Sequence, residues 1–371
     1  MNSPKSKPKI ALACPSFSGG GAERVMVTLA NKFSDYGYPV DFLVGVDKGP
    51  YKYMLDKDIN KIVLTNQHSG RLKKLVCALF KLRQYKNSTS ADVLMSTVRE
   101  FNVFIFFALS FSNRKIKVFL REAAALDESH FNGSLRGKLL LCLMRYSYKR
   151  ASKVISNSDA TRQGIVEYLG LSKEDVFSIY NPLDIDENPG RVIKKSKKKV
   201  VISVGRLVKN KNFHDLIRAI PLVKEKHGEI ILKILGEGED EKELRRLART
   251  LNIENSVQFV GFVDNPYDYY READVFAQTS LWEGFGYVLA EAMACGTPVV
   301  AYDSKGAMRE ILADGKYGKL TPVGDLQALA DAIILQIEDP TPSELLEEAV
   351  ERFDVEVIAK QYLEALGVNH D

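Results

Sequence analysis

Short apolar segments alternate along this chain with longer segments in which apolar residues recur every three or four positions. Residues 9–15 are mostly apolar, three glycines follow at 19–21, and residues 23–33 carry apolar side chains at helical spacing. This order predicts a strand, a glycine loop and a helix at the start of the chain.

The same alternation continues through both halves. It predicts strands at residues 40–46, 59–64, 91–96, 117–121 and 153–157, and again at 200–204, 230–235, 257–261, 275–278 and 298–302. Strands that alternate with helices predict parallel, doubly wound sheets. The predicted fold class is therefore α/β, with two Rossmann-like domains. The last apolar pattern, at residues 343–366, predicts one long helix.

The length of 371 residues also indicates two domains, because a single hydrophobic core seldom grows beyond about 250–300 residues. We expect a first domain at residues 1–185, a basic linker at 186–199 and a second domain at 200–354. The sequence leaves open whether the last helical segment, at about residues 355–371, packs back on the first domain.

The formal net charge of +4 conceals two halves of opposite charge. Residues 1–185 hold 28 Lys and Arg against 16 Asp and Glu, a net of +12, and residues 186–199 hold 6 against 2, a net of +4. Residues 200–371 hold 18 against 30, a net of −12. A basic half attracts a phospholipid surface, a lipid diphosphate or nucleic acid. Nucleic acid is disfavoured, because the chain has no aromatic stacking motif, helix-turn-helix pattern or zinc-ligand spacing.

Two segments of the basic half combine apolar side chains with Lys and Arg. Residues 71–86 are predicted to place Leu72, Leu75, Val76, Leu79 and Leu82 on one side of a helix among six basic residues, and residues 135–153 repeat this composition. Such helices either lie on an anionic membrane surface or pack against the core with solvated basic flanks. The +12 charge of this half favours the membrane surface.

Cysteine spacing and the absence of long apolar runs indicate the compartment. Cys14, Cys77, Cys142 and Cys295 have no paired spacing, which fits a reducing cytoplasm. The first residues lack an apolar signal core, and the longest apolar run, residues 103–109, is too short to cross a bilayer. We expect a cytoplasmic protein, peripheral on the inner face of the cytoplasmic membrane.

Residues 283–298 carry the strongest functional pattern. Glu283 and Glu291 are eight positions apart, Gly284 and Gly286 follow the first, and a helix is predicted to begin near Tyr287. Glycines allow a backbone to approach a phosphate or sugar closely, and the free N–H groups at a helix start favour anions. The pattern predicts a sugar-nucleotide site. The alternative is a surface loop before an amphipathic helix with solvated Glu residues.

Two loops near strand ends are candidates for binding a diphosphate. Arg206 and Lys211 follow the strand predicted at 200–204, where a guanidinium and an ammonium suit a leaving group that gains negative charge. In the first glycine loop, Gly20 and Gly21 expose N–H groups beside a helix start. That loop lacks the Gly-x-Gly-x-x-Gly of dinucleotide sites, and a structural tight turn remains an equal alternative.

Taken together, these motifs resemble the retaining glycosyltransferases of family 4, which have the GT-B fold. The resemblance runs from residue 9 to about residue 325. It rests on Gly-Gly-Gly-Ala-Glu-Arg at 19–24, Tyr-Asn-Pro-Leu-Asp at 180–184, Val-Gly-Arg-Leu at 204–207 followed by Lys211, Leu-Gly-Glu-Gly at 235–238, Val-Gly-Phe at 260–262 and Glu-Gly-Phe-Gly at 283–286.

The resemblance implies roles for these residues in the second domain. Glu283 would contact the hydroxyls of the transferred sugar, and Glu291 the ribose. Arg206 and Lys211 would bind the diphosphate and support its departure, the backbone of Gly284, Phe285 and Gly286 would hold sugar and phosphate, and Val260 and Phe262 would lie near the base.

In the first domain, the resemblance implies that Gly20 and Gly21 close on the diphosphate, and Arg24 and Glu122 are candidates for the acceptor side. The chain departs from many relatives at Arg121-Glu122-Ala123-Ala124, where those relatives have a His after a Glu.

The resemblance implies a nucleotide-sugar substrate, and we expect no cofactor and no metal. Asp184-Ile185-Asp186 imitates a manganese motif of another glycosyltransferase fold, but it follows Asn-Pro-Leu at the domain junction and has no further oxygen ligands nearby in sequence. We therefore interpret it as a turn.

The expected function is transfer of a hexose or N-acetylhexosamine from a nucleotide sugar, UDP-linked in the favoured interpretation, to a lipid-linked or membrane-proximal saccharide. Assembly of a surface polysaccharide or glycan would suit this activity. Two alternatives remain open: transfer to a soluble acceptor, and a non-catalytic subunit that binds a sugar nucleotide.

Overall fold

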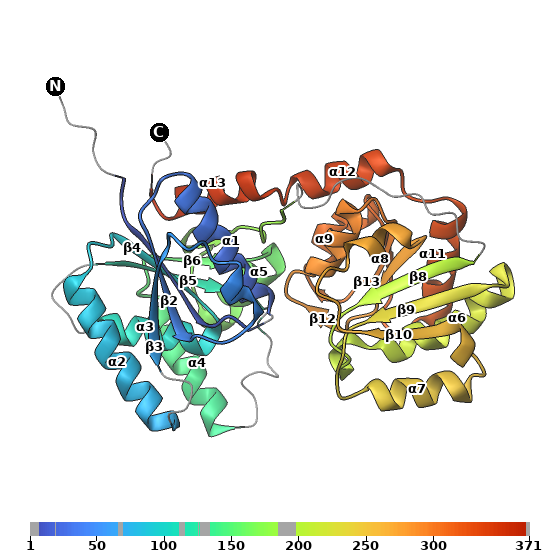
Figure 1. The fold of residues 1–371 in the computed structure, drawn as a ribbon, viewed down its shortest axis with the longest axis horizontal. Helices are drawn as coiled ribbons and strands as arrows, with labels where there is room; N and C mark the ends of the chain where they lie inside the picture. Colours follow the sequence, from blue (N-terminus) through green and yellow to red (C-terminus); the bar gives the residue numbers. More distant parts are fainter. Residues whose placement is uncertain are drawn as a thin grey trace. The chain divides into compact units, whose positions relative to one another are not determined.

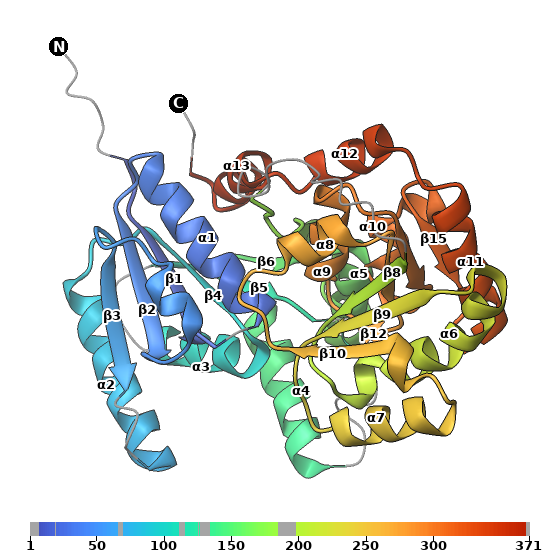
Figure 2. The ribbon, with the colours of Figure 1, turned by 45° about the vertical axis from the view of Figure 1, so that its right-hand side comes forward.

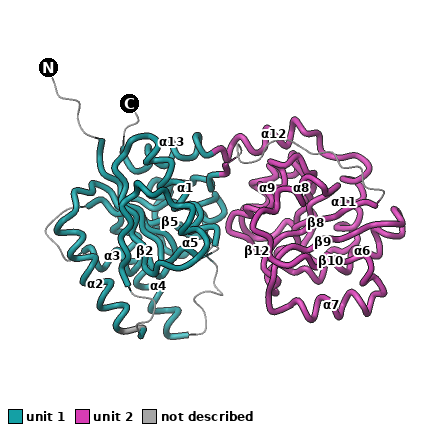
Figure 3. Tube along the Cα trace, in the orientation of Figure 1, with its two compact units in different colours: residues 1–182, 355–371 teal, residues 183–354 magenta. Residues whose placement is uncertain are grey.

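The computed structural model describes residues 7–18, 20–65, 70–110, 116–124, 126, 134–184 and 198–368. The chain forms two compact units, which are Met1–Pro182 with Val355–Asp371, and Leu183–Asp354 (Figure 3). Most of the linker predicted at 186–199 lies outside the described residues, as do Ile185 and Asp186; Lys199 is already the first residue of a strand.

Unit 1 contains a seven-stranded sheet in the order β3-β2-β1-β4-β5-β6-β7, in which every pair is parallel. Crossovers from one parallel strand to the next require intervening helices. The predicted α/β class is confirmed, although the short β7 was not predicted. The strands are β1 (Ile10–Ser16), β2 (Val40–Val46), β3 (Asn60–Thr65), β4 (Val93–Thr97), β5 (Lys117–Glu122), β6 (Lys153–Ser156) and β7 (Val176–Ser178).

The helices of unit 1 form two groups (Figure 1). α2, α3, α4 and α5 contact one another in series, whereas α1 contacts the last helix of the chain, α13. Strands β1, β2 and β4 are buried along almost their whole length, as expected when helices cover both faces of a sheet. The helices are α1 (Gly21–Asp35), α2 (Arg71–Ser88), α3 (Arg99–Ser110), α4 (Leu135–Tyr148), α5 (Asp159–Leu169) and α13 (Val355–Ala365).

Unit 2 contains a six-stranded parallel sheet in the order β10-β9-β8-β11-β13-β15 and a separate two-stranded sheet, β12-β14. Figure 2 shows β15 beside α11, which packs on it. The strands are β8 (Lys199–Val204), β9 (Ile230–Leu235), β10 (Val257–Gly261), β11 (Val275–Gln278), β12 (Trp282–Glu283), β13 (Val299–Tyr302), β14 (Lys305–Gly306) and β15 (Lys319–Thr321).

The helices of unit 2 also form two groups. α6 contacts α7 and α11, and α9 contacts α8 and α12. The helices are α6 (Phe213–His227), α7 (Glu241–Thr250), α8 (Tyr267–Glu272), α9 (Tyr287–Ala294), α10 (Met308–Ile311), α11 (Leu326–Glu338) and α12 (Ser343–Glu351).

The prediction of one long helix at 343–366 is wrong, because the chain breaks between α12 and α13. At the break, Phe353 is fully buried and its ring meets that of Phe285 edge-on, with centroids 5.2 Å apart. The Phe353 carbonyl also accepts a hydrogen bond from Leu183 N at 2.6 Å. These tertiary contacts outweigh helix propensity, which is a weak preference by comparison.

The helix predicted at residues 71–86 forms as part of α2, and its apolar side chains differ in exposure. Leu82 is buried and Leu79 partly buried, but Leu75 and Val76 are exposed together with Phe80. The helix therefore packs against unit 1 through the narrow stripe that includes Leu79 and Leu82, and its other apolar side chains remain exposed. The Leu72 side chain lies outside the described part of the structure. In the second basic segment the helix ends at Tyr148, and Lys153 begins β6.

Candidate active site

The carboxyl ends of three adjacent strands of unit 2 are joined by backbone hydrogen bonds. Gly205 N donates to Leu235 O at 2.9 Å, and Gly236 N donates to Gly261 O at 2.7 Å. The loops that follow β8, β9 and β10 therefore lie side by side at one edge of the sheet. This edge is where open α/β sheets bind their ligands.

Glu283 lies in a polar cluster at this edge. Lys211 Nζ is 2.5 Å from Glu283 Oε2, and Gln278 Nε2 donates to the same oxygen at 3.2 Å. The side chains of Lys211 and Glu283 are 18% and 19% exposed. Among the residues that the structure describes, none donates to Glu283 Oε1. One carboxylate oxygen is thus held by the protein, and the other is left for a hydroxyl donor.

The loop of Lys211 is fixed to the segment that leads into Glu283. Thr279 Oγ1 donates to Asn212 O at 2.9 Å, Leu281 N donates to Asn210 O at 2.8 Å, and Asn210 Nδ2 donates to Trp282 O at 3.0 Å. Residues 67 to 72 positions apart are thereby held together by three hydrogen bonds in addition to the ion pair.

Two glycines make the turn around Glu283 feasible. Gly306 pairs with Glu283 across β12-β14 and has a φ of +119°; a Cβ there would lie 1.7 Å from Glu283 O. Gly286, with a φ of +88°, precedes the first turn of α9, and a Cβ there would lie 2.4 Å from Met308 Cε. At Gly306 only glycine fits both the left-handed backbone and the approach to a carbonyl oxygen, whereas at Gly286 the left-handed backbone alone favours glycine, because the Met308 side chain can move.

Glu291 lies in α9 and is buried. The Tyr270 hydroxyl donates to Glu291 Oε2 at 3.3 Å. Burial, and then the nearby Glu291 charge, raise the pKa of Tyr270 well above its usual range, so the hydroxyl stays protonated as a donor. A buried carboxylate with a neutral donor is suited to accept hydrogen bonds from a diol.

The other predicted residues of this unit lie at or just after the ends of β8, β10 and β12. Arg206 is exposed, and no partner for its guanidinium occurs in the described part of the chain. Val260 is half-buried and Phe262 is 67% exposed, just where β10 ends. Gly284 is half-buried, whereas the Phe285 side chain is buried and packs on Phe353. Phe285 therefore anchors the loop through its buried ring.

Three of the four predicted residues of unit 1 lie at the start of α1. Gly20 is the residue before the helix, and Gly21 is its first residue and exposed. The Glu23 carboxylate folds back over Gly20, where a Cβ would lie 2.5 Å from Glu23 Oε2. Burial raises the pKa of Glu23. Arg24 is half-buried.

Glu122 lies in the interior of unit 1. It is 2% exposed, accepts a hydrogen bond from the Tyr148 hydroxyl at 2.9 Å and pairs with Arg99 at 3.4 Å. Both carboxylate oxygens are engaged. Glu122 therefore holds neighbouring side chains in place in this structure and presents no oxygen to an acceptor.

Arg121 is fully buried and was not singled out by the sequence. Its guanidinium donates to the Tyr362 hydroxyl at 2.8 Å, Asn181 Oδ1 at 2.5 Å and Thr97 Oγ1 at 3.2 Å. Arg121, at the carboxyl end of β5, thus connects α13 and the segment at Asn181 with the carboxyl end of β4 through hydrogen bonds.

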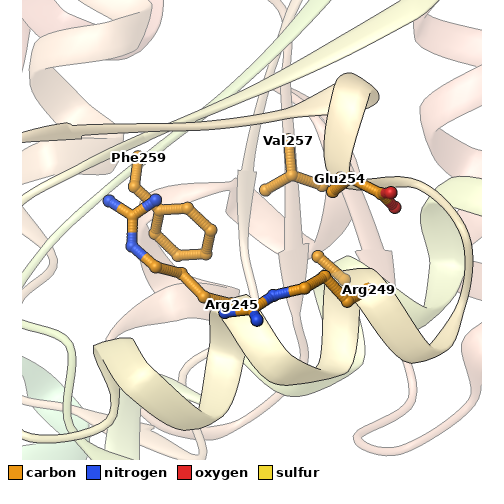
Figure 4. A pocket seen from close by; sticks show the side chains of 6 residues that line it. Arg245, Arg249, Glu254, Val257 and Phe259 are labelled. Carbon is orange, nitrogen blue, oxygen red and sulfur yellow. The ribbon is translucent and has the colours of Figure 1, made fainter.

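A shallow cavity of about 220 Å³ lies elsewhere in unit 2, between α7 and β10 (Figure 4). The Arg245 guanidinium lies over the Phe259 ring, 4.5 Å from its centroid, and Arg249 lies beside it. None of the predicted site residues lines this cavity. In the described ranges, no group of three or more His, Cys, Asp and Glu side chains is placed to hold a metal ion.

Two family models divide the chain between them. Residues 19–187 match the model described as Glycosyltransferase Family 4, and residues 184–353 match Glycosyl transferases group 1. A curated relative from Campylobacter jejuni is 30% identical over 89% of this chain and 90% of its own. The chain belongs to glycosyltransferase family 4.

The Campylobacter relative is an N-acetylgalactosamine-N,N'-diacetylbacillosaminyl-diphospho-undecaprenol 4-alpha-N-acetylgalactosaminyltransferase. Among solved structures, Anabaena HepE with UDP-glucose is 28% identical, with a TM-score of 0.81 over 97% of this chain and 99% of that one. The outer core galactosyltransferase WaaB has a TM-score of 0.77 at 21% identity over 97% and 99% of the two chains, which supports the fold alone. The protein is therefore a nucleotide-sugar-dependent glycosyltransferase with the GT-B fold, as the motifs predicted.

Gln278 and Tyr270, whose side chains donate hydrogen bonds to Glu283 and Glu291, were not predicted from the sequence. The sequence did contain one sign of Gln278, which is a polar residue that ends an otherwise apolar strand. Tyr270 gave no sign, because an aromatic residue on a short helix is compatible with ordinary core packing.

Proposed function

We propose that this protein transfers a hexose or N-acetylhexosamine from a UDP-sugar to a lipid-linked or membrane-proximal saccharide, with retention of anomeric configuration and without a metal. The reaction would serve the assembly of a surface polysaccharide or glycan. The observation that supports the proposal is the contact between Lys211 and Glu283. The cation that we propose for the diphosphate lies next to the carboxylate that we propose for the sugar hydroxyls.

The chemistry follows from where charge develops. As the bond between sugar and diphosphate breaks, negative charge gathers on the departing phosphate. Arg206 and Lys211 supply a guanidinium and an ammonium for that charge. Exposed Phe262 offers a flat apolar surface to a base. With cations and orienting carboxylates from the protein itself, the transfer needs no protein nucleophile and no metal.

Similar proteins support the choice of donor and acceptor. HepE has been solved with UDP and with UDP-glucose, and it is 28% identical to this chain over nearly its whole length. The Campylobacter relative acts on a saccharide carried by diphospho-undecaprenol. We infer the same chemical classes here, a UDP-sugar donor and an acceptor that carries a lipid diphosphate.

We further propose that α2 and α4 place unit 1 on an anionic membrane at the inner face of the cytoplasmic membrane. Phe80 on α2 is 70% exposed, and Leu135 and Leu139 on α4 are 88% and 60% exposed. Exposed cations such as Arg83 and Lys138 lie on the same helices. Apolar side chains surrounded by Lys and Arg fit the interface of an anionic bilayer. In the described part of the chain, no helix is long and apolar enough to span a membrane.

Vesicle cosedimentation tests the membrane proposal. Wild type should sediment with phosphatidylglycerol vesicles at low salt and dissociate as salt rises, and Leu139→Asp with Phe80→Asp should weaken binding at least about tenfold. The matched control is Leu335→Asp, which alters a 42% exposed leucine of α11 in unit 2 and should bind normally. Equal sedimentation of all three proteins contradicts the proposed surface.

A transfer assay tests the enzymatic proposal. The assay compares three proteins: wild type, Glu283→Gln and the control Glu272→Gln. Each is incubated with UDP-, GDP- or ADP-sugars and polyprenyl diphosphate saccharides, and the masses of the products are measured by mass spectrometry. Glu272 is a second half-buried carboxylate of unit 2, 3.3 Å from Lys233. We expect one sugar on the lipid acceptor from a UDP donor, lost only in Glu283→Gln.

Each alternative outcome of this assay rejects a named part of the proposal. Extension of soluble saccharides alone rejects the lipid acceptor, preference for GDP- or ADP-sugars rejects UDP, and an anomer opposite to that of the donor, seen by NMR, rejects retention. No transfer to any acceptor in the panel favours a non-catalytic subunit.

A further inference from the structure

The buried side-chain amide of Gln278 contacts the Glu283 carboxylate. Gln278 is the last residue of β11, whose other residues are Val275, Phe276 and Ala277, and all four are buried. An amide at such a position costs free energy unless it is hydrogen-bonded. Its Nε2 donates to Glu283 Oε2 at 3.2 Å and approaches Ser280 Oγ at 3.4 Å.

The chemistry of the pair fixes the orientation of this amide. An ionised carboxylate only accepts hydrogen bonds, so Gln278 must direct its nitrogen, not its oxygen, at Glu283. In this orientation Gln278 Oε1 is buried without a partner among the described residues. The amide nitrogen of Gln278 therefore donates to Glu283 although the amide oxygen accepts no hydrogen bond from the described residues.

Two donors share Glu283 Oε2, but they differ in what else they bind. Under the proposed function, Lys211 must turn its charge to the diphosphate when the donor binds. A carboxylate held by Lys211 alone would then lose its fixed position. Gln278 is the other described donor to Oε2, it is neutral, and its place at the end of a buried strand keeps it there.

We propose that Gln278 is a positioning residue that keeps Oε2 of Glu283 anchored in the donor complex, so that Oε1 faces the transferred sugar while Lys211 serves the diphosphate. This inference rests on the proposed function and adds a residue that acts through Glu283. It predicts an effect on turnover rather than on nucleotide binding, since UDP without sugar makes no use of Glu283.

Gln278→Leu removes the donor at similar volume. With the UDP-sugar that wild type uses, we expect kcat to fall about 10- to 100-fold, because misplacement of a reacting group costs rates of this order. Donor KM should change less than about threefold, and UDP affinity by calorimetry should stay within about twofold of wild type. The matched control is Gln336→Leu, which removes another buried amide of unit 2 that donates to Val299 O at 3.1 Å. This control should lower Tm but leave kcat unchanged.

Gln278→Glu provides a readout that a purely structural role would not move. Two adjacent carboxylates share a proton as pH falls, and the protonated one donates a hydrogen bond to the other, as the amide does in wild type. The kcat of Gln278→Glu should therefore recover toward wild type between about pH 8 and pH 5, whereas the ratio of Gln278→Leu to wild type should stay constant.

The outcomes separate the two proposals. A wild type that transfers no sugar overturns the proposed function, and the role of Gln278 with it. An active wild type with Gln278→Leu at full kcat, or with Gln278→Glu following the wild-type pH profile, overturns the role of Gln278 alone. Loss of UDP binding by Gln278→Leu would show that its effect is structural and also overturns the assignment.

Discussion

The ion pair between Lys211 and Glu283 can be tested in the free protein by a double-mutant cycle. The variants are Lys211→Met, Glu283→Gln and both together, and the quantity measured is the free energy of unfolding of each. The structure places Nζ and Oε2 2.5 Å apart, with both side chains nearly a fifth exposed. The pair belongs to unit 2, so it should be broken when that unit unfolds.

Coulomb's law limits the expected coupling energy. At this distance the attraction is about 7 kcal/mol for an effective dielectric constant of about 20 and about 2 kcal/mol in bulk water. Partial exposure, desolvation and the ordering of two long side chains all reduce that value, so we expect a coupling energy of about 1–2 kcal/mol. It should decrease as salt rises, because exposed charges are screened.

Urea unfolding followed by fluorescence of the single tryptophan, Trp282, provides the assay. That residue lies directly before Glu283 and should report on unit 2. The matched cycle uses Lys233 and Glu272, a pair 3.3 Å apart with greater exposure of the carboxylate, and should give a coupling below about 1 kcal/mol. Additive effects of Lys211→Met and Glu283→Gln, with coupling under about 0.3 kcal/mol, would refute the pairing on which the proposed site rests.

Three further predictions concern the same unit. In thermal unfolding, Gly306→Ala should destabilise the protein by about 3 kcal/mol or more, because strain at positive φ adds to a clash with the Glu283 carbonyl, and it should abolish transfer. The control Gly315→Ala, also at positive φ but in open space, should cost about 1 kcal/mol in the same experiment. Tyr270→Phe should raise donor KM about 3- to 10-fold in steady-state kinetics, with kcat nearly unchanged, because it removes one neutral hydrogen bond to Glu291; an unchanged KM would argue against a ribose role for that carboxylate. Transfer should proceed equally in EDTA and in added manganese, and loss in EDTA that manganese restores would contradict metal independence.

The fold class was readable because its signals are local. Four predicted strands, 40–46, 230–235, 257–261 and 275–278, have the bounds of β2, β9, β10 and β11. Buried parallel strands appear in the sequence as continuous apolar runs, and the helices between them appear as apolar residues at every third or fourth position. Both patterns can be recognised without knowledge of distant contacts. The order of glycine-containing loops was enough to indicate the family.

Where local pattern and tertiary contact disagreed, the contact decided. The pattern at 343–366 is helical throughout, yet the burial of Phe353 against Phe285 divides it. On α2, periodicity put Leu75 on the same side as Leu82, but exposure differs between them. Hydrophobic spacing shows that a helix has an apolar side and does not show how much of it a neighbour covers.

The sequence by itself determined the α/β architecture, the family and the identity of Glu283, Glu291 and Lys211 as candidates. Only the tertiary structure decided that Lys211 and Gln278 both contact one oxygen of Glu283. It also decided that Tyr148 and Arg99 engage the Glu122 carboxylate in the interior of unit 1. The physical reason is that spacing along a chain restricts which residues are neighbours on one element. A hydrogen bond a few ångströms long between residues 72 positions apart depends on the packing of every element between them.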